Sequence, residues 1–570
     1  MTQPAKVFYK VSWGDPESHL FDVEVEFRAT GRTTELRLPA WRPGRYLIQN
    51  YAANVRQWSA TNSHGKSLLV EKTDKSTWSV RTKAGERTTF RYRFFAGVLD
   101  AGSSYLSIEE CYFNGTNLLM LVNGQRESAA SLEIAVPEGW LIETQLTADG
   151  KGRFLARDYD YLIDSPVLAS PSLVTHTFVE SGCRISLIFQ NAEGEDTSRF
   201  VAPVQSIVAA HIARFGGIPT REYRFLYHYA DLWHGVEHED SCSITLKGDE
   251  LRGASPGDES FDHFLAITSH EFFHLWNVKR IIPALFLPYD YSKETYTRLL
   301  WAMEGITSYF GERTLLTSGL WSPGRYLEHL AAEIDTLEAI PGREFLSLAQ
   351  ASFDGWLQEP SQMHDKGKAW ISFYNKGEIV AALLDLEIRR RTLGRRSLDD
   401  VMLTLWNRYG KKARGLEEDA IEKAAVSVAG SDCSEFFRRY VDGVEPLPYD
   451  ELFGVVGLRM EAKDTDVKQE LNATLVARSN RLLVTGSADP ELEVDDEIIA
   501  VNERRVLSTA AVTTAIGGLE ICTVTIVRAG AIRTVQLAAV SVAVNARVLI
   551  EVESGEEVMK LRDGWLGMNS

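Results

Sequence analysis

The feature that most constrains this 570-residue chain is the segment HEFFH at residues 270–274. On a helix, residues four apart lie on one face, so His270 and His274 can reach one metal ion. Ser260 can cap such a helix, and Asp262 in its first turn favours the helix dipole. Zinc binds histidine nitrogen in a tetrahedral arrangement, so two histidines one helical turn apart suit this metal. The segment therefore predicts a helix that supplies two zinc ligands.

Two carboxylates complete the expected metal site. Glu271 would lie beside the open coordination position, where a carboxylate can take a proton from water whose pKa zinc has lowered to about 7. Glu304, in the sequence WAMEGITSYF, is the expected third ligand. The interval between His274 and Glu304 lets the chain leave one helix and return antiparallel on a second, expected at about residues 293–318. Gly305 removes a side chain beside Glu304 and would let the second helix approach closely.

The sequence changes character several times along the chain. Residues 1–175 alternate apolar and polar side chains between turn-rich stretches, which predicts an N-terminal antiparallel β-sandwich-like domain. Residues 176–320 mix strands and helices around the HEFFH segment, and helices dominate residues 321–445. The β character returns over residues 446–545, and a tail follows at 546–570. We therefore expect a multidomain α+β protein with an N-terminal β domain, a zinc catalytic domain, a helical domain and a C-terminal β domain.

Composition disfavours several classes of function. The chain has 79 acidic and 61 basic residues, and a net charge of -18 disfavours binding to nucleic acid and to anionic membranes. No apolar stretch reaches the roughly 18 residues that span a bilayer, and the N-terminus lacks the pattern of a signal peptide. The five cysteines have neither metal-site nor redox spacing, which favours free thiols in a reducing compartment. We therefore expect a cytoplasmic protein without nucleic-acid or membrane partners.

The motifs resemble those of a known family. HEFFHLWNVKR and WAMEG, together with LPAWRPGRYLIQNYAANV at residues 38–55, are similar to the glycyl aminopeptidase family of gluzincin zinc metallopeptidases. The resemblance covers residues 5 to 540 approximately. It implies a thermolysin-like catalytic domain with one Zn²⁺ per chain. It also implies that His270, His274 and Glu304 are the metal ligands and that Glu271 is the general base.

The resemblance further implies how a peptide is held. Residues 233–238 look like the Gly-x-x-Glu motif with which related aminopeptidases bind the substrate amine, and Gly235 and His238, beside Glu237, are further candidates for substrate binding. Glu237 would then bind the N-terminal ammonium, and a carboxylate beside the scissile bond restricts cleavage to unblocked N-termini. Tyr374, in Tyr-Asn-Lys-Gly, resembles the tyrosine whose hydroxyl stabilises the tetrahedral intermediate.

Several of these residues have a plain structural alternative. Glu237 could be one carboxylate of the acidic run EHED, and Tyr374 could open a buried helix and simply pack. His238 could contact substrate or be a satisfied structural histidine. Asn114, in Tyr-Phe-Asn-Gly, could close the far side of the substrate pocket or belong to a β-turn. A further group is expected to support the end of the metal helix rather than to do chemistry: Asn277, Lys279 and Arg280.

The C-terminal segments GLRMEAK, DEIIAVNERRV and ICTVTIVRAGAIRTVQL resemble a PDZ domain. PDZ domains bind an extended peptide at a sheet edge. Asp495-Asp496 stands where Gly-Asp is usual, and a glycine-rich carboxylate-binding loop is missing. Docking or gating of the catalytic site, including an intramolecular contact, is therefore an equal alternative to peptide capture.

Together these features predict a zinc-dependent aminopeptidase that acts on peptides with a free N-terminus. The family resemblance implies Gly or Ala as the residue removed. The alternative is a catalytically inactive scaffold that binds peptides through its PDZ domain. Stoichiometric zinc would separate the two, because a scaffold has no need of the metal.

Overall fold

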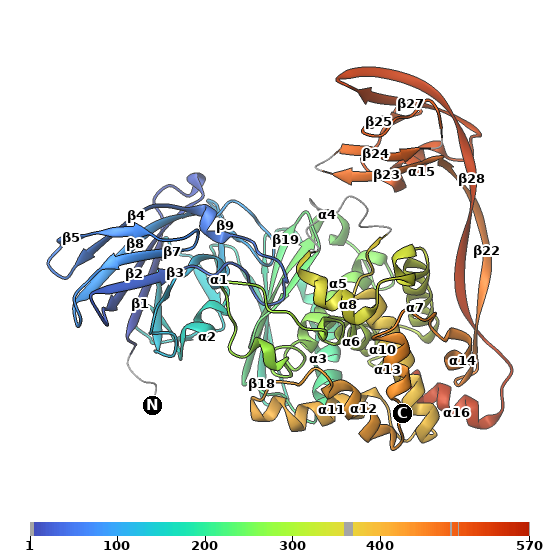
Figure 1. The fold of residues 1–570 in the computed structure, drawn as a ribbon, viewed down its shortest axis with the longest axis horizontal. Coiled ribbons are helices and arrows are strands. Elements are labelled where there is room, and N and C mark those ends of the chain that lie inside the picture. Colours follow the sequence, from blue (N-terminus) through green and yellow to red (C-terminus); the bar gives the residue numbers. More distant parts are fainter. Residues whose placement is uncertain (1–4, 358–368, 479–480, 488, 569–570) are drawn as a thin grey trace. The chain divides into compact units, whose positions relative to one another are not determined.

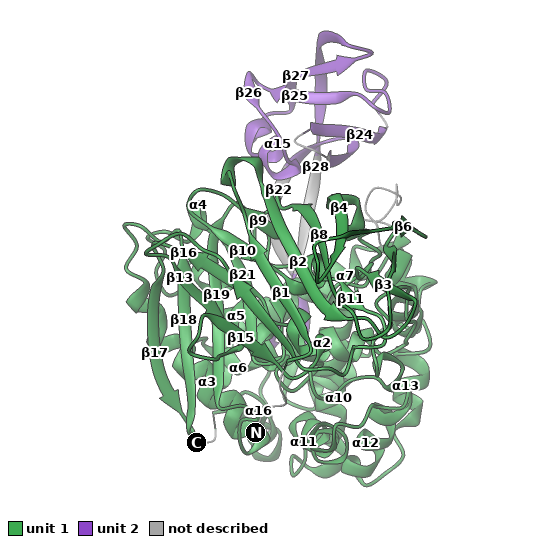
Figure 2. Ribbon diagram, turned by 90° about the vertical axis from the view of Figure 1, so that its left-hand side faces the viewer, with its two compact units in different colours: residues 1–458, 552–570 green, residues 459–551 purple. Residues whose placement is uncertain are grey.

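The computed structural model describes residues 5–357, 369–478, 481–487 and 489–568. It divides into two compact units, residues 1–458 with 552–570 and residues 459–551 (Figure 2). The expected order of an N-terminal β domain, a mixed region, a helical region and a C-terminal β region is confirmed (Figure 1). Among the described residues, no helix is long and apolar enough to cross a membrane. The five cysteines are buried free thiols.

The N-terminal β domain consists of three sheets around one apolar core. The largest has the strand order β14 (Thr147–Ala148), β15 (Arg153–Ala156), β12 (Ala130–Ile134), β1 (Val7–Ser12), β2 (Leu20–Arg28), β8 (Arg87–Phe95), β4 (Val55–Asn62) and β5 (Ser67–Leu68). A second sheet has the order β13 (Leu141–Thr144), β16 (Val167–Ser170), β10 (Cys111–Phe113) and β9 (Ser104–Leu106). A third has the order β11 (Leu121–Val122), β3 (Thr33–Arg37), β7 (Thr77–Arg81) and β6 (Val70–Lys72). The pairing is antiparallel except between β1 and β12.

The core of this domain is formed by strands in which apolar and polar side chains alternate. In β2, every second side chain from Phe21 to Phe27 is buried, because successive side chains of a strand point to opposite faces. The expected alternating segment 21–27 is therefore a strand with one face in the core. Two short helices, α1 (Gly115–Leu118) and α2 (Tyr159–Ile163), lie between strands of this domain.

The mixed sheet of the catalytic region has the order β17 (Val174–Glu180), β18 (Cys183–Gln190), β19 (Glu222–Ala230), β21 (Ser241–Lys247) and β20 (His234–Glu237). The central strands β18, β19 and β21 are parallel, and β17 and β20 are antiparallel edge strands. The sequence predicts strands at RISLIFQ (184–190) and REYRFLYHY (221–229), and these segments correspond to β18 and β19. The sheet ends at β20, so the backbone of this strand has a single neighbouring strand in the described part of the chain.

Helices α3 (Val201–Phe215), α5 (Glu259–Phe273) and α6 (Ile306–Thr317) pack on one another beside this sheet (Figure 1). The helix predicted through HEFFH is confirmed, but its cap is not Ser260. Asp258 has the extended backbone of an N-cap residue, and Ser260 already lies within the first turn.

The second predicted helix, 293–318, begins later than expected. A short π-helical segment, η5 (Trp301–Gly305), leads directly into α6. The carboxylate of Glu418 explains the difference, because it accepts hydrogen bonds from Thr297 Oγ1 at 2.6 Å and from Arg298 N at 2.9 Å. These contacts hold the backbone before η5 outside the helix.

The first unit contains further helices among its described residues. They are α4 (Gly248–Leu251), α7 (Pro323–Glu338), α8 (Leu348–Phe353), α10 (Asn375–Thr392), α11 (Leu398–Arg408), α12 (Ala420–Ala429), α13 (Ser434–Tyr440), α14 (Tyr449–Gly454) and α16 (Glu556–Trp565). Of these, α7 and α10 pack against α6. The sequence predicts helices at 323–338, 368–392, 397–408, 416–428 and 432–441, and all but the second are confirmed to within a few residues. The helix expected at 368–392 begins at Asn375, and residue 368 lies outside the described residues.

The second unit, taken by itself, contains a sheet with one helix. Its strand order is β22 (Leu458–Leu471), β28 (Ala531–Glu551), β27 (Ile521–Arg528), β25 (Glu497–Val501), β24 (Arg481–Ser487) and β23 (Ala473–Arg478), and β26 (Arg504–Arg505) pairs with β25. Helix α15 (Thr509–Ile516) contributes Val512 and Ile516 to the core. Asp495 has a φ of 74°, a left-handed conformation that suits the glycine usual at this place in PDZ sequences. Asp496 is buried and pairs with Arg528 at 2.6 Å.

Candidate metal centre and substrate cavity

Three ligand atoms converge where α5 packs against η5 and α6. His270 Nε2 and His274 Nε2 are 3.1 Å apart. Glu304 Oε2 lies 3.7 Å from His270 Nε2 and 3.4 Å from His274 Nε2. A tetrahedral zinc ion with bonds of about 2.0–2.1 Å keeps its ligand atoms about 3.3 Å apart. These three residues, called the metal triad below, therefore have the spacing that zinc requires.

Close backbone contact brings Glu304 to this point. A Cβ atom on Gly305 would overlap with the backbone of Gly377 in α10, so only glycine allows η5 and α10 to approach this closely. The close approach expected from Gly305 is therefore confirmed, and its partner is a second glycine. The π-helical turn at Glu304 is typical of functional sites, where such turns re-aim one side chain.

Neighbouring residues orient the metal triad. His274 Nδ1 donates a 2.6 Å hydrogen bond to the backbone oxygen of Asn277, which leaves Nε2 to face a metal. The Asn277 side chain donates in turn to the Ala302 oxygen at 2.9 Å, so it joins the end of α5 to η5. The support expected from Asn277 is confirmed. Tyr46 Oη donates to Glu304 Oε1 at 3.3 Å.

Two more carboxylates lie beside the metal triad. Glu271 and Glu237 are each 5% exposed, and ligand atoms of both lie within 4.8 Å of one another and of a His274 nitrogen. Gly235 lies so close to Glu271 that a Cβ atom at 235 would overlap with its carboxylate. Glu271 Oε2 and Glu237 Oε1 are buried without a hydrogen-bond partner among the described residues. Such atoms point to a bound group that would satisfy them.

The buried charges of this site favour the binding of a cation. Burial, together with the neighbouring Glu237 and Glu304, raises the pKa of the Glu271 carboxyl. Burial opposes a charged imidazole at His274, yet Glu304 and Glu237 raise its pKa to about 10. Three buried carboxylates thus draw positive charge into the site. A divalent cation on the metal triad would supply it, so donor set, spacing and charge all fit zinc.

A cavity of about 680 Å³ opens over these residues. The structure brings together nearly all of the predicted site residues on its wall: Gly235, Glu237, His270, Glu271, His274, Glu304 and Tyr374. The Tyr374 side chain is 38% exposed, and its ring lies stacked 6.3 Å from that of His270. This predicted oxyanion donor therefore has access to the cavity.

Two predicted residues lie elsewhere. His238 is buried outside the cavity wall, and its Nδ1 is 3.3 Å from Asp164 Oδ1. Asn114 is also buried, and its amide donates to the Ala101 oxygen at 3.2 Å. Neither lines the cavity, so neither has direct access to a substrate here.

The cavity also reaches a second group of titratable side chains, Glu312, His329 and Glu333. Together with Glu378, which pairs with His329, they are called the acidic cluster. His329 Nε2 lies 2.8 Å from Glu378 Oε1. Asn375 Nδ2 donates to Glu333 Oε2 at 2.6 Å. The cluster joins α6, α7 and α10.

Sequence reasoning missed two residues of the site. Tyr46 supports Glu304 from the β domain, and Asp164 contacts the turn that follows Glu237. The only sequence signal for Tyr46 was its place within residues 38–55, the segment that carried the family resemblance. Asp164 had no signal, because its partners His238 and Glu239 belong to a distant part of the chain.

Comparisons with known proteins show which families and structures this chain resembles. Residues 8–171 match the model of the Peptidase M61 N-terminal domain, and residues 263–380 match that of M61 glycyl aminopeptidase. A crystal structure of an aminopeptidase N family protein from Idiomarina loihiensis is 28% identical, with a TM-score of 0.87 over 98% of this chain and 100% of that one. An M1 zinc metallopeptidase from Deinococcus radiodurans is 14% identical, with a TM-score of 0.48 over 78% of this chain and 96% of that one. Curated protein sequences give no match.

The fold and the metal triad define a metallopeptidase. The chain belongs to the M61 glycyl aminopeptidase family. It is a zinc aminopeptidase, as the sequence motifs predicted.

Proposed function

We propose that this enzyme hydrolyses the first peptide bond of peptides with a free N-terminus, and that it prefers Gly or Ala there. One observation carries the proposal: the buried carboxylate of Glu237, whose Oε1 has no hydrogen-bond partner among the described residues, lies beside Glu271 and the metal triad. An ammonium bound to Glu237 would bring the first peptide bond close to Glu271 and the metal triad. The preference for Gly or Ala rests on the family alone.

The proposed roles follow from what each side chain faces. His270, His274 and Glu304 would hold the zinc ion, which when bound polarises water and the scissile carbonyl. Glu271 would accept the proton of the attacking water and deliver it to the leaving amine. Its pKa, raised by burial and by neighbouring carboxylates, suits a group that must hold and release a proton. The Tyr374 hydroxyl would donate to the developing oxyanion.

A pair of peptides that differ only at the N-terminus tests this proposal. Wild-type enzyme should cleave Gly-Ala-Phe far faster than acetyl-Gly-Ala-Phe, because acetylation removes the ammonium that Glu237 binds. A chelator should abolish turnover, and added zinc should restore it. Equal cleavage of both peptides would instead indicate an endopeptidase. A panel of aminoacyl chromogenic substrates would test the preference for Gly and Ala.

An inactive scaffold has less support, since the metal triad, Glu271 and Tyr374 share one cavity. We propose a PDZ-like module for residues 459–551, on the basis of its sequence, its sheet with one helix and the left-handed Asp495. Docking or gating suits it better than capture of a peptide, because the glycine-rich carboxylate loop is missing from the sequence. Tight binding of short peptides with a free C-terminal carboxylate to the Glu271→Gln enzyme, lost when residues 459–551 are deleted, would reverse that choice. We also place the enzyme in the cytoplasm, as its free cysteines suggest.

A further inference from the structure

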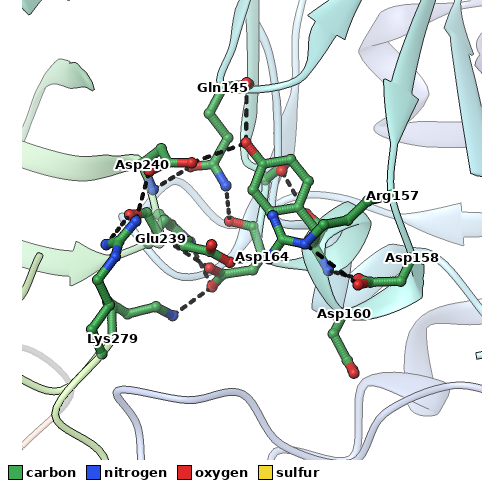
Figure 3. A network of polar contacts seen from close by, with 12 residues as sticks. Gln145, Arg157, Asp158, Asp160, Asp164, Glu239, Asp240 and Lys279 are labelled. Atoms are coloured by element: carbon green, nitrogen blue, oxygen red, sulfur yellow. Dashed lines mark hydrogen bonds and ion pairs between the residues drawn. The ribbon is translucent and has the colours of Figure 1, made fainter. Parts of the chain in front are cut away.

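The turn that follows Glu237 is held by many polar contacts (Figure 3). Glu237 is the last residue of β20, and the turn at residues 238–241 leads into β21. His238 N donates to Ser241 O at 2.9 Å, which closes the turn. The surrounding side chains come from the β domain and from the segment after α5. Figure 3 labels Glu239 and Asp240 of the turn, and from neighbouring segments Gln145, Arg157, Asp158, Asp160, Asp164 and Lys279.

Asp164 binds two catalytic segments at once. It follows α2 in the β domain, and its Oδ2 accepts a hydrogen bond from Glu239 N at 2.8 Å. Its Oδ1 accepts from Lys279 Nζ at 2.8 Å and lies 3.3 Å from His238 Nδ1. His238 and Glu239 directly follow Glu237, and Lys279 lies shortly after the metal ligand His274. One carboxylate therefore links the segment that carries Glu237 to the segment that follows the metal helix.

The other contacts of the turn are of two kinds. Some join the turn to the β domain alone, and others join the two catalytic segments directly to each other. Gln145 Oε1 accepts from Ser241 Oγ at 2.6 Å, and Tyr161 Oη donates to Asp240 Oδ2 at 3.1 Å. Arg280 donates to Asp240 Oδ1 at 3.0 Å, from the segment after α5. These contacts shape the turn. Only Asp164, among the labelled residues of the β domain in Figure 3, also touches residues 279–280.

Glu237 depends on this turn more than a residue in a central strand would. It lies on an edge strand, so its backbone pairs with β21 alone. Its Oε1 atom has no hydrogen-bond partner among the described residues, so side-chain bonds do not fix that oxygen. An error of about 1 Å in the position of a substrate-binding group can lower activity about 10²-fold. The turn therefore helps to set the distance between Glu237 and the metal helix, together with the close contact between Gly235 and Glu271.

We propose that Asp164 is a positioning residue that holds Glu237 at the correct distance from α5. Its contacts with His238, Glu239 and Lys279 couple the binding of the substrate ammonium to the β domain. Asp164 remains charged in the working pH range, because burial is outweighed by Lys279 and His238, which lower its pKa to about 2. The inference rests on the proposed function, since it assigns Glu237 to the substrate amine.

The test compares Asp164→Ala with Asp160→Ala in the full-length zinc enzyme. Asp160 lies on α2, the helix that Asp164 directly follows, but its carboxylate binds Arg126 at 2.9 Å and Tyr291 at 2.9 Å, away from the turn. We measure zinc content, kcat, KM and the rate ratio of free over acetylated peptide. Asp164→Ala should keep one zinc per chain, raise KM for the free peptide about 10- to 100-fold and lower the rate ratio by a similar factor. Asp160→Ala should leave KM and the rate ratio within about twofold.

Asp164→Asn provides the conservative variant. Its amide oxygen can still accept from Glu239 N, so its KM should fall between those of wild type and Asp164→Ala. It also replaces Asp164→Ala in these measurements if that variant fails to fold. Unchanged KM and rate ratio in Asp164→Asn and Asp164→Ala, or equal changes in Asp160→Ala, would overturn the proposal. A wild-type enzyme that cleaves acetylated and free peptides equally would instead refute the proposed function itself.

Discussion

The cavity contains two groups of histidine and carboxylate side chains that differ in geometry. In the metal triad, two histidine nitrogens and a carboxylate oxygen face one point. In the acidic cluster, His329 pairs with Glu378, and its members do not form a convergent ligand set among the described residues. Both groups are largely buried, and in both a histidine has a raised pKa. Residue composition therefore does not distinguish a metal site from an ion pair.

Local geometry makes the difference. His270 and His274 are one turn apart on α5, so their Nε2 atoms are 3.1 Å apart. The acidic cluster offers a single histidine, on α7, and its ring nitrogen is already bound to a carboxylate on α10. A metal ion there would find carboxylates but no second imidazole. We therefore expect chemistry at the metal triad, and support of the cavity wall at the acidic cluster.

Among substitutions of side chains that donate or accept a proton, Glu271→Gln should cause the largest loss of activity. The amide cannot accept the proton of the attacking water, so kcat should fall about 10²- to 10⁴-fold while zinc remains bound. Glu312→Gln is the matched control in the acidic cluster, and its kcat should stay within about threefold. Steady-state kinetics with a glycyl substrate measures the kcat of both variants. If both variants lose activity equally, the contrast between the two groups is wrong.

A smaller loss is expected for Tyr374→Phe. The variant removes the hydroxyl that we assign to the oxyanion and keeps the ring that stacks near His270. Removal of one oxyanion donor costs about 10²- to 10³-fold in kcat with little change in KM. Tyr309→Phe is a suitable control, because its hydroxyl binds the buried Asp385 at 2.7 Å behind the metal helices. A kcat equal to that of wild type would remove Tyr374 from the mechanism.

The smallest effect on activity should come from His329→Gln, whose consequence is on stability. Burial opposes charge on His329, but Glu378 and Glu312 raise its pKa to about 10. Because this lies above the ordinary value of about 6.5, the imidazolium stabilises the fold fully below about pH 6.5 and loses its effect as the pH rises through about 10. Wild type should therefore exceed His329→Gln in Tm most at about pH 6 and least near pH 10. A Tm difference that is constant over this range would contradict the assignment.

The sequence predicted those parts of the site that local patterns encode. The spacing of the two histidines in HEFFH predicted His270 and His274 as ligands. The apolar surroundings of Glu304 on the following helix predicted Glu304 as a ligand, with Gly305 beside it. Tertiary contacts decided the rest. The start of η5 depends on Glu418 and the surroundings of Glu237 depend on Asp164, and each of these carboxylates comes from a distant part of the chain. Spacing cannot reveal such contacts, because they exist only once distant segments meet.

The central claim is that the metal triad, and not the acidic cluster, binds the metal. Zinc content per chain tests this claim most directly. We compare purified wild type, His270→Ala and His329→Gln by elemental analysis after dialysis. The expected result is one zinc in wild type and in His329→Gln, and a loss of bound zinc in His270→Ala. Full zinc in His270→Ala, or its loss in His329→Gln, would contradict the assignment of the metal site.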